Sequence, residues 1–444
     1  MHKSFKKHKM ILNISICNYR SFKDETSFSM IAESSKSKTQ NVFIQPLAEG
    51  KDQERLLKVA LIYGANASGK SNFLRAVFDI RNFICGKTKP KAGEPIPAYD
   101  AFCFAEETKD APIDFSIDFV GNDQIKYKYE LSFDREKVLK ETLTYYPNNN
   151  PKLLFTRIVP EMSNANTHIG KLGPSFKNEE INVLYNQSVL SKFGDDFPNQ
   201  IITDVFIYFS NFDIINIHNS RMISSLIKEV SAEMSKNNDL NRRMDELLKF
   251  ADTGLNGVQI VETPEEKLNF PDTMPDSLKN QLISDYKFNV SFLHNHFENG
   301  QLLKRDKPHK IGQESKGTQT IYALGGKLFQ ILNKGGVIFV DELETSLHPY
   351  LSKLLVSMFQ NERINPKNAQ LIFTTHDTNL LDHTIFRKDQ IWFTEKNEYG
   401  ATELYSLQDF SDVREDTPYA KWYMAGKFGG IPNLKSIESL FLDE

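Results

Sequence analysis

The residues with the clearest chemical potential form a glycine-rich segment, Gly64–Ser71, that matches the pattern G-x-x-x-x-G-K-[ST] over its full length. Glycines let the backbone curve closely around an anion, so that successive N–H groups point inward. Lys70 is expected to reach the β and γ phosphates, and Ser71 to offer its hydroxyl to Mg²⁺. The segment therefore predicts a nucleoside triphosphate site. The residues expected to contact the nucleotide are Gly64, Asn66, Ala67, Ser68, Gly69, Lys70, Ser71 and Asn72.

Two neighbouring carboxylates, Asp341 and Glu342, follow the apolar run at residues 337–340. Ligands of open α/β sheets sit at the carboxyl ends of strands, so Asp341 is expected to hold Mg²⁺, directly or through water, opposite Ser71. Glu342 is expected to polarise the attacking water, because phosphoryl transfer depends mainly on positioning and charge stabilisation. A solvated acidic turn or a helix cap is the alternative. The carboxylate of Glu344 is as compatible with a role at the start of a helix as with a catalytic role.

A histidine, His376, follows a second predicted strand at residues 371–375. An imidazole at a strand end can donate a hydrogen bond to a γ-phosphate and so respond to its presence. A lone histidine is more often structural. Its place after the glycine-rich segment and the acidic strand favours the catalytic interpretation here.

These residues need strands and helices to position them, and hydrophobic periodicity predicts where those lie. Residues 10–16 alternate as an opening strand, and residues 57–63 form a short apolar run typical of a buried parallel strand. From Lys70 the apolar residues recur three and four apart, which predicts a helix. Residues 112–159 alternate again between turn signals, which predicts an antiparallel meander.

The chain is expected to divide into three segments. Residues 1–180 form a first ATPase lobe with the glycine-rich loop and the meander, and residues 181–300 form a mainly helical insertion, with amphipathic helices within 223–250. Residues 301–444 form a second lobe. Its predicted elements are a helix over 317–332, a strand over 337–340, a helix over 349–359 and a strand over 370–374.

Composition restricts the class of protein. With 444 residues, 40% hydrophobic and 25% charged, the chain is typical of a globular protein with two or three compact units. Its net charge of -4 argues against coating nucleic acid by net charge alone. The 3 cysteines show no metal-ligand spacing. No signal peptide and no apolar run of about 18 residues is seen, so a cytoplasmic location without membrane contact is expected.

The motifs, taken in order, resemble those of the ABC-type ATPases of the SMC, RecF and overcoming-lysogenization-defect superfamily, with ATPase domains of the AAA_15 and AAA_21 kind. Residues 18–22 look like the opening motif of that group, and 64–71 like its phosphate loop. Residues 341–349 are similar to its acidic strand and dimer-contact loop, and 374–376 to its switch histidine. Residues 314–318 look like its divergent signature.

The resemblance implies an α/β fold: an ABC-type P-loop ATPase head with an antiparallel β subdomain and a helical insertion. It also implies ATP and Mg²⁺ as cofactors, and a head-to-tail homodimer or higher oligomer. In such a dimer the signature of one subunit closes over ATP held by the other, and slow hydrolysis by Glu342 reopens it. The signature residues expected to contact ATP are Ser315, Gly317 and Thr318. Donors just before a helix suit a γ-phosphate, although such a segment is often a simple helix cap.

Three C-terminal segments resemble one particular group of these ATPases: residues 389–396, 403–407 and 426–432. They look like the ATPase subunits of two-component anti-phage systems of the abortive-infection L (RloA) kind, to which the PARIS and Septu ATPases are related. This implies a regulatory ATPase that controls a separate effector, with a nuclease as the expected effector and a phage-derived trigger. The insertion is the expected place of partner recognition. Unlike the overcoming-lysogenization-defect nucleases, the chain is expected to have no room for a nuclease domain. It also shows no clear glutamine-loop motif, and Phe102–Phe104 is the candidate for that position.

Two other functions compete with this one. A RecF-like or SMC-like ATPase of DNA repair would bind DNA, and the basic run at residues 304–310 offers a surface, although charge runs are usually solvated faces. The motor of a membrane transporter is the least favoured, because the opening strand and the insertion differ from what the resemblance implies for transporter subunits.

Overall fold

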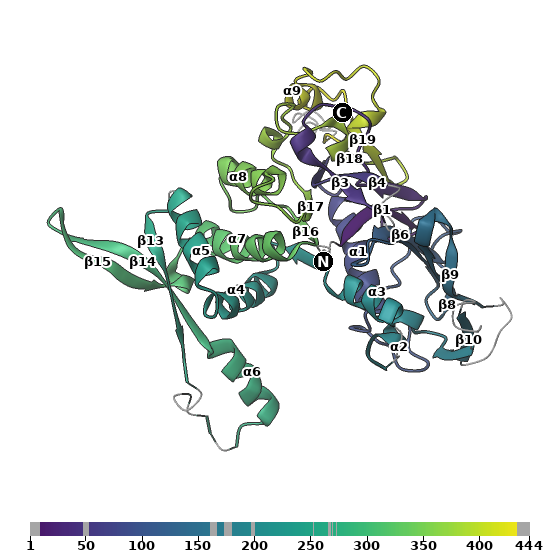
Figure 1. Cartoon of the computed structure of the whole chain (residues 1–444), viewed down its shortest axis with the longest axis horizontal. Helices are drawn as coiled ribbons and strands as arrows, with labels where there is room; N and C mark the ends of the chain where they lie inside the picture. Colours follow the sequence, from purple (N-terminus) through teal and green to yellow (C-terminus); the bar gives the residue numbers. More distant parts are fainter. Residues whose placement is uncertain are drawn as a thin grey trace, which may run out of the picture. The chain divides into compact units, whose positions relative to one another are not determined.

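The computed structural model describes residues 9–47, 53–159, 167–172, 180–196, 200–251, 253–264, 268, 270–271 and 273–432. The chain forms two compact units (Figure 1). Unit 1 comprises residues 1–214, 334–342 and 356–444, and unit 2 comprises residues 215–333 and 343–355. The short segment 334–342 of unit 1 is thus preceded and followed in the chain by unit 2.

A six-stranded sheet at the centre of unit 1 has the order β12-β16-β17-β5-β18-β19. Strands β16, β17, β5 and β18 are parallel, and β19 runs antiparallel to β18. The residues of β5 and β17 are all buried, as expected of parallel strands covered on both faces. The strands are β5 (Val59–Gly64), β12 (Asp213–Asn216), β16 (Val337–Asp341), β17 (Gln370–Thr374), β18 (Ile391–Lys396) and β19 (Thr402–Ser406).

A second sheet in unit 1 has eight strands in the order β11-β10-β9-β8-β7-β6-β1-β2. Strands β6 to β9 follow one another in the chain, and each pairs antiparallel with the next, which confirms the predicted meander. The strands are β1 (Met10–Cys17), β2 (Thr26–Ser29), β6 (Ile113–Val120), β7 (Lys126–Phe133), β8 (Val138–Tyr146), β9 (Lys152–Ile158), β10 (Thr167–Leu172) and β11 (Glu180–Leu184). A separate pair is formed by β3 (Val42–Pro46) and β4 (Gln53–Leu57).

Helix α1 (Lys70–Ile84) joins the two sheets of unit 1 into one core. Its apolar residues Phe73, Val77 and Ile80 belong to the same hydrophobic cluster as Phe115 of β6 and Ile62 of β5. Burying a helix stripe of this kind stabilises the fold by roughly 1.5–3 kcal/mol per large side chain. Helices α2 (Val189–Asp196), α3 (Gln200–Ser210) and α9 (Tyr419–Met424) also belong to unit 1. The predicted α/β class with an antiparallel β subdomain is confirmed.

Unit 2 is built around helix α7 (Lys316–Lys334), which packs against α4 (Ser220–Met234) and α5 (Asn238–Phe250). Two adjacent glycines in α7 allow the close approach: a Cβ at Gly325 would lie 2.5 Å from Leu247 Cδ2, and one at Gly326 would lie 2.3 Å from Val230 Cγ1. Asparagine side chains cap both α4 and α5. Both helices lie largely within the segment 223–250, where amphipathic helices were predicted. Helix α6 (Asp276–Tyr286) also lies in unit 2, and α8 (Pro349–Gln360) begins there.

The region predicted as a mainly helical insertion, residues 181–300, holds helices α2 to α6 and also contains strands. Strands β13 (Leu255–Glu262), β14 (Phe288–Glu298) and β15 (Gln301–Lys310) form an antiparallel sheet in unit 2. The β14–β15 hairpin turns at Asn299 and Gly300, whose φ values are 49° and 80°. Positive φ at both turn residues matches the twist of paired strands. The predicted boundaries at 180 and 300 also differ from those of the compact units.

Candidate functional site

The glycine-rich loop connects β5 to α1 in unit 1, as its sequence context predicts. The ammonium of Lys70 is buried and donates to the carbonyl oxygens of Gly64 and Ala65 at 2.7 and 3.0 Å. It therefore points into the loop. Asn66 and Ala67 at the tip are exposed, and Ala67 has a φ of 63°, which is uncommon for a residue with a Cβ. Helix α1 begins at Lys70, directly after the loop, so the positive end of its dipole lies at the loop.

Gly64 and Gly69 are required by the close approach of the loop to its neighbours. A Cβ at Gly64 would lie 2.3 Å from Thr394 Oγ1, and one at Gly69 would lie 2.3 Å from Thr402 Oγ1. Gly69 also has a φ of 112°, in the region that only glycine adopts without strain. Both glycines of the motif are therefore needed for the loop's shape.

The acidic strand meets the loop directly. The Ser71 hydroxyl donates to Asp341 Oδ1 at 3.0 Å, although the two residues are 270 positions apart. The Thr374 hydroxyl at the end of β17 donates to the same oxygen at 2.7 Å. Asp341 is 5% exposed. The structure thus brings the predicted ligands Ser71 and Asp341 together at the carboxyl ends of β5, β16 and β17.

Glu342 and His376 lie at the same edge of the sheet. The backbone N–H of Glu342 donates to Thr374 Oγ1 at 2.8 Å. Its φ of 54° is unusual for a non-glycine residue, and conformations of this kind gather at functional sites. His376 Nε2 lies 3.4 Å from Glu342 Oε1, and His376 is exposed. The two predicted catalytic side chains are therefore close enough to act on one group.

The opening motif supports the start of α1. The Asn72 amide donates to Ser21 Oγ at 2.8 Å, and its oxygen accepts from Arg20 Nη1 at 3.1 Å. Arg20 also pairs with Asp100 at 2.7 Å. Asn72 was predicted as a nucleotide contact; in the structure its amide group connects α1 to the segment after β1.

Two threonines that sequence reasoning missed hold the loop from β18 and β19. Thr394 Oγ1 lies 2.6 Å from Ser68 Oγ, and the Thr402 hydroxyl donates to the Ser68 carbonyl at 2.8 Å. The Thr402 N–H in turn donates to the Ser21 carbonyl at 2.6 Å. Thr394 lies within the segment 389–396, but nothing in the sequence singles out either threonine as a contact of the loop.

The predicted signature residues lie in unit 2, where Ser315 precedes the first turn of α7. Ser315 Oγ accepts from the Thr318 N–H at 3.1 Å and lies 2.9 Å from Thr318 Oγ1. A Cβ at Gly317 would lie 2.6 Å from the Ser346 carbonyl oxygen. The signature segment therefore contacts the predicted dimer-contact loop. Ser315 acts here as a helix cap, which leaves the functional interpretation of residues 315–318 open.

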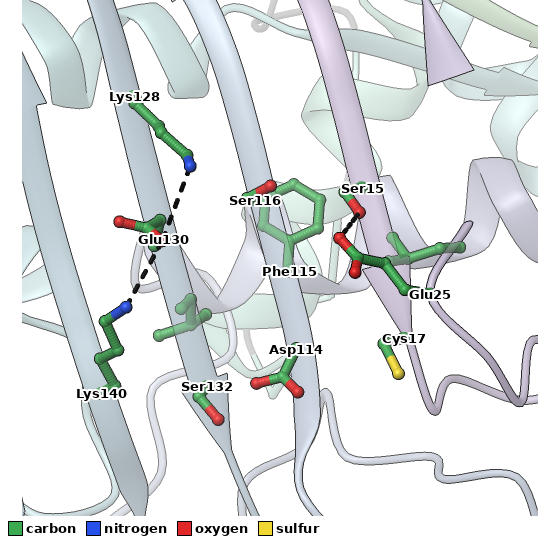
Figure 2. A pocket seen from close by; sticks show the side chains of 12 residues that line it. Ser15, Cys17, Glu25, Asp114, Phe115, Ser116, Lys128, Glu130, Ser132 and Lys140 are labelled. Atoms are coloured by element: carbon green, nitrogen blue, oxygen red, sulfur yellow. Dashed lines mark hydrogen bonds and ion pairs between the residues drawn. The ribbon is translucent and has the colours of Figure 1, made fainter. Parts of the chain in front are cut away.

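Two further features are the candidate glutamine-loop segment and a pocket on the antiparallel sheet. Phe102, named as a stand-in for the glutamine loop, is buried, and its N–H donates to Asn18 Oδ1 at 3.1 Å, whereas Phe104 is 69% exposed. A pocket of about 310 Å³ lies on β1, β6 and β7 (Figure 2). Its charged lining includes Glu25, Asp114 and Lys140, and no residue of the glycine-rich loop lines it.

A family model matches residues 59–158 and 210–382, which is more than half of the chain. The family is AAA_21, described as "AAA domain, putative AbiEii toxin, Type IV TA system". The chain belongs to the AAA_21 family. As a member of this P-loop ATPase domain family, the protein has the nucleotide-binding class of site that its loop predicts, and the family is associated with toxin systems.

Solved structures of other ATPases are similar to this AAA_21 protein at low identity. The SMC head bound to the C-terminal winged-helix domain of ScpA shares 12% identity, with 89% of this chain and 97% of that chain covered and a TM-score of 0.43. RecF with ATP shares 15% identity, with 91% and 100% covered and a TM-score of 0.36. No curated protein matches the sequence. Among the described residues, no helix has the length and apolar character needed to cross a membrane.

Proposed function

We propose that the protein binds ATP with Mg²⁺ at the loop between β5 and α1 and hydrolyses it slowly. The contact between Ser71 and Asp341 is the observation that carries this proposal. Two oxygens that each lie about 2.1 Å from an octahedral Mg²⁺ at a right angle are about 3 Å apart. The two oxygens lie 3.0 Å apart, so one ion would replace the hydrogen bond with little movement.

The same edge of the sheet supports a mechanism. Lys70 would exchange its carbonyl partners for phosphate oxygens, which a positive charge binds more strongly. Glu342 would orient the attacking water, and His376, 3.4 Å from it, would donate to the γ-phosphate. Such positioned groups supply most of the catalysis in phosphoryl transfer, because the reaction needs orientation and charge stabilisation more than covalent participation.

We extend the proposal to regulation. Two copies of the chain would dimerise when ATP is bound, with Ser315, Gly317 and Thr318 of one copy contacting the nucleotide of the other. The dimer would control a separate cytoplasmic effector, with a nuclease as the expected kind, in a bacterial anti-phage defence system that responds to a phage-derived trigger. The association of the AAA_21 family with a toxin system supports this assignment over a transport motor.

The effector assignment is tested on the gene that lies next to the one encoding this chain. We expect its product to co-purify with this chain, and phage resistance to need both genes. Phage plating with each gene deleted, together with the mass of the co-expressed complex with and without ATP, measures this. Purification of the chain alone, combined with full resistance after deletion of the neighbour, would rule out a separate effector encoded there.

A DNA-binding ATPase is the second candidate, and the exposed strand β15 favours it. Lys304, Arg305 and Lys307 are all exposed on this strand. Each phosphate contact contributes about 0.9 to the slope of log K against log salt. Replacing all three by glutamine is expected to reduce an ATP-dependent DNA affinity and lower that slope by about 2–3. Lys279→Gln, an exposed change on α6, is the matched control. An unchanged affinity and slope would exclude β15 as a DNA surface.

A further inference from the structure

Two imidazoles and one carboxylate converge in unit 2, outside the ATP site. His294 Nε2 lies 2.8 Å from Glu314 Oε1, and His309 Nδ1 lies 2.7 Å from the same oxygen. One potential ligand atom from each residue lies within 4.8 Å of the other two. The side chain of Glu314 is 9% exposed, whereas those of His294 and His309 are 36% and 44% exposed. The carboxylate is therefore covered and the imidazoles remain open to solvent.

The hairpin and the helix start fix this geometry. Across β14 and β15, Phe292 faces His309 and His294 faces Lys307, so the two histidines are diagonal neighbours on one face of the hairpin. Glu314 follows a short 3₁₀ turn whose ends are bonded to each other, and its carbonyl accepts from the Gln319 side chain at 2.9 Å. Backbone structure therefore holds all three residues, which lowers the entropy cost of bringing them together.

We propose that His294, His309 and Glu314 form a binding site for a divalent transition metal of the zinc class. Imidazole nitrogen and carboxylate oxygen are typical zinc ligands, at about 2.0–2.2 Å, and sites with three protein ligands leave a fourth position open. Tetrahedral ligand atoms at those distances are about 3.4 Å apart. The present contacts of 2.7 and 2.8 Å would need to lengthen by about 0.6–0.7 Å, which small side-chain rotations allow.

The charges around the cluster bear on which ion it takes. Burial raises the pKa of the Glu314 carboxyl, but hydrogen bonds from His309 and His294 outweigh that effect and the pKa lies below its usual value. Lys307 on β15 lies opposite His294. Its Nζ contacts a histidine outside the cluster, His296, at 3.4 Å from Nδ1. Imidazole nitrogen suits ions of the zinc class, whereas Mg²⁺ and Ca²⁺ prefer oxygen ligands, so nitrogen-preferring ions are expected to bind in place of Mg²⁺ or Ca²⁺.

A metal ion here would connect the hairpin to the start of α7. Glu314 directly precedes Ser315, whose hydroxyl caps the helix through the Thr318 N–H. An ion bound to His294, His309 and Glu314 would therefore fix the segment that also carries the signature residues. Its influence on ATP turnover depends on the proposed function; the binding of the ion itself does not.

Metal binding to the whole protein tests the site. The purified chain is stripped with a chelator, exchanged into excess Mg²⁺ without nucleotide, and titrated with Co²⁺ and then Zn²⁺. We expect one Co²⁺ per chain with the strong visible absorption of a four-coordinate ion, displaced by Zn²⁺. His294→Ala and His309→Ala should each weaken binding at least about tenfold, since even loss of a residue behind a ligand costs that much. His296→Ala, on the same hairpin, is the matched control and should bind as wild type does.

The alternative is a hydrogen-bonded cluster that takes no ion. It would be supported, and the proposal overturned, if wild type bound no more Co²⁺ or Zn²⁺ than the His294→Ala/His309→Ala double variant. Equal loss in His296→Ala would also overturn it, because that histidine lies outside the cluster. Circular dichroism checks that each variant is folded. If an alanine variant unfolds, Glu314→Gln provides the comparison, since it keeps the shape and hydrogen bonds but removes the ligand's charge.

Discussion

Replacing Lys70 by alanine is expected to abolish detectable ATP turnover and to weaken ATP binding by about 10- to 100-fold. The ammonium is buried and points into the loop, where it donates to Gly64 and Ala65. A charged hydrogen bond to a phosphate contributes about 1.5–3 kcal/mol, which corresponds to that range of affinity. Loss of a positive group that stabilises charge in the transition state costs a further 10²–10³ in rate. Calorimetry with ATP and a phosphate-release assay measure the two effects separately.

Arg75→Ala is the matched control for this change. Arg75 lies on the same helix but is exposed, and its ion pair with Asp79 contributes at most a few tenths of a kcal/mol. Its removal should leave nucleotide binding and turnover near wild type. If Lys70→Ala bound ATP as tightly as wild type, the loop between β5 and α1 would not be the phosphate site.

Replacing Glu342 by glutamine is expected to lower turnover by about 10²–10⁴ while ATP stays bound. Glutamine keeps the size of the side chain and its position near His376 but cannot orient water as a carboxylate does. The backbone of Glu342, held by Thr374, is unaffected. Since hydrolysis would reopen the dimer, the variant should accumulate as a dimer in ATP and Mg²⁺. Light scattering during gel filtration, with and without ATP, measures that mass.

Glu403→Gln, an exposed carboxylate change on β19, is the control for the Glu342 variant. It should hydrolyse ATP normally and show the wild-type mass. Hydrolysis by Glu342→Gln at the wild-type rate would exclude Glu342 as the catalytic carboxylate. A monomer that binds ATP but cannot turn it over would keep the catalytic role and exclude closure by dimerisation.

The elements that carry the motifs were predictable because each has a strong local pattern. The short apolar run that stops at Gly64 is typical of a buried strand, and the three-and-four spacing after Lys70 predicts a helix, so β5 and α1 followed from sequence. The contact between Ser71 and Asp341 followed from one further rule, that ligands gather at the carboxyl ends of parallel strands.

The supporting contacts were not predictable, because they depend on strand order. Thr394 and Thr402 reach the loop only because β18 lies beside β5, and nothing local to either residue indicates that neighbour. The β14–β15 hairpin is a different case. Phe288, Val290 and Phe292 alternate ahead of an Asn-Gly turn, a signal that the polar character of the surrounding region obscured.

The route of the chain between its units has a mechanical consequence. The chain leaves unit 2 just before residue 334, runs through β16 and returns to unit 2 after residue 342. The strand with Asp341 is therefore tethered at both ends, and Gly335 and Gly336, with φ values of 76° and 126°, form one tether. The backbone on both sides of Asp341 and Glu342 thus continues directly into unit 2. Under the proposed function, a change at these residues when phosphate is released would pass to unit 2 through the chain itself.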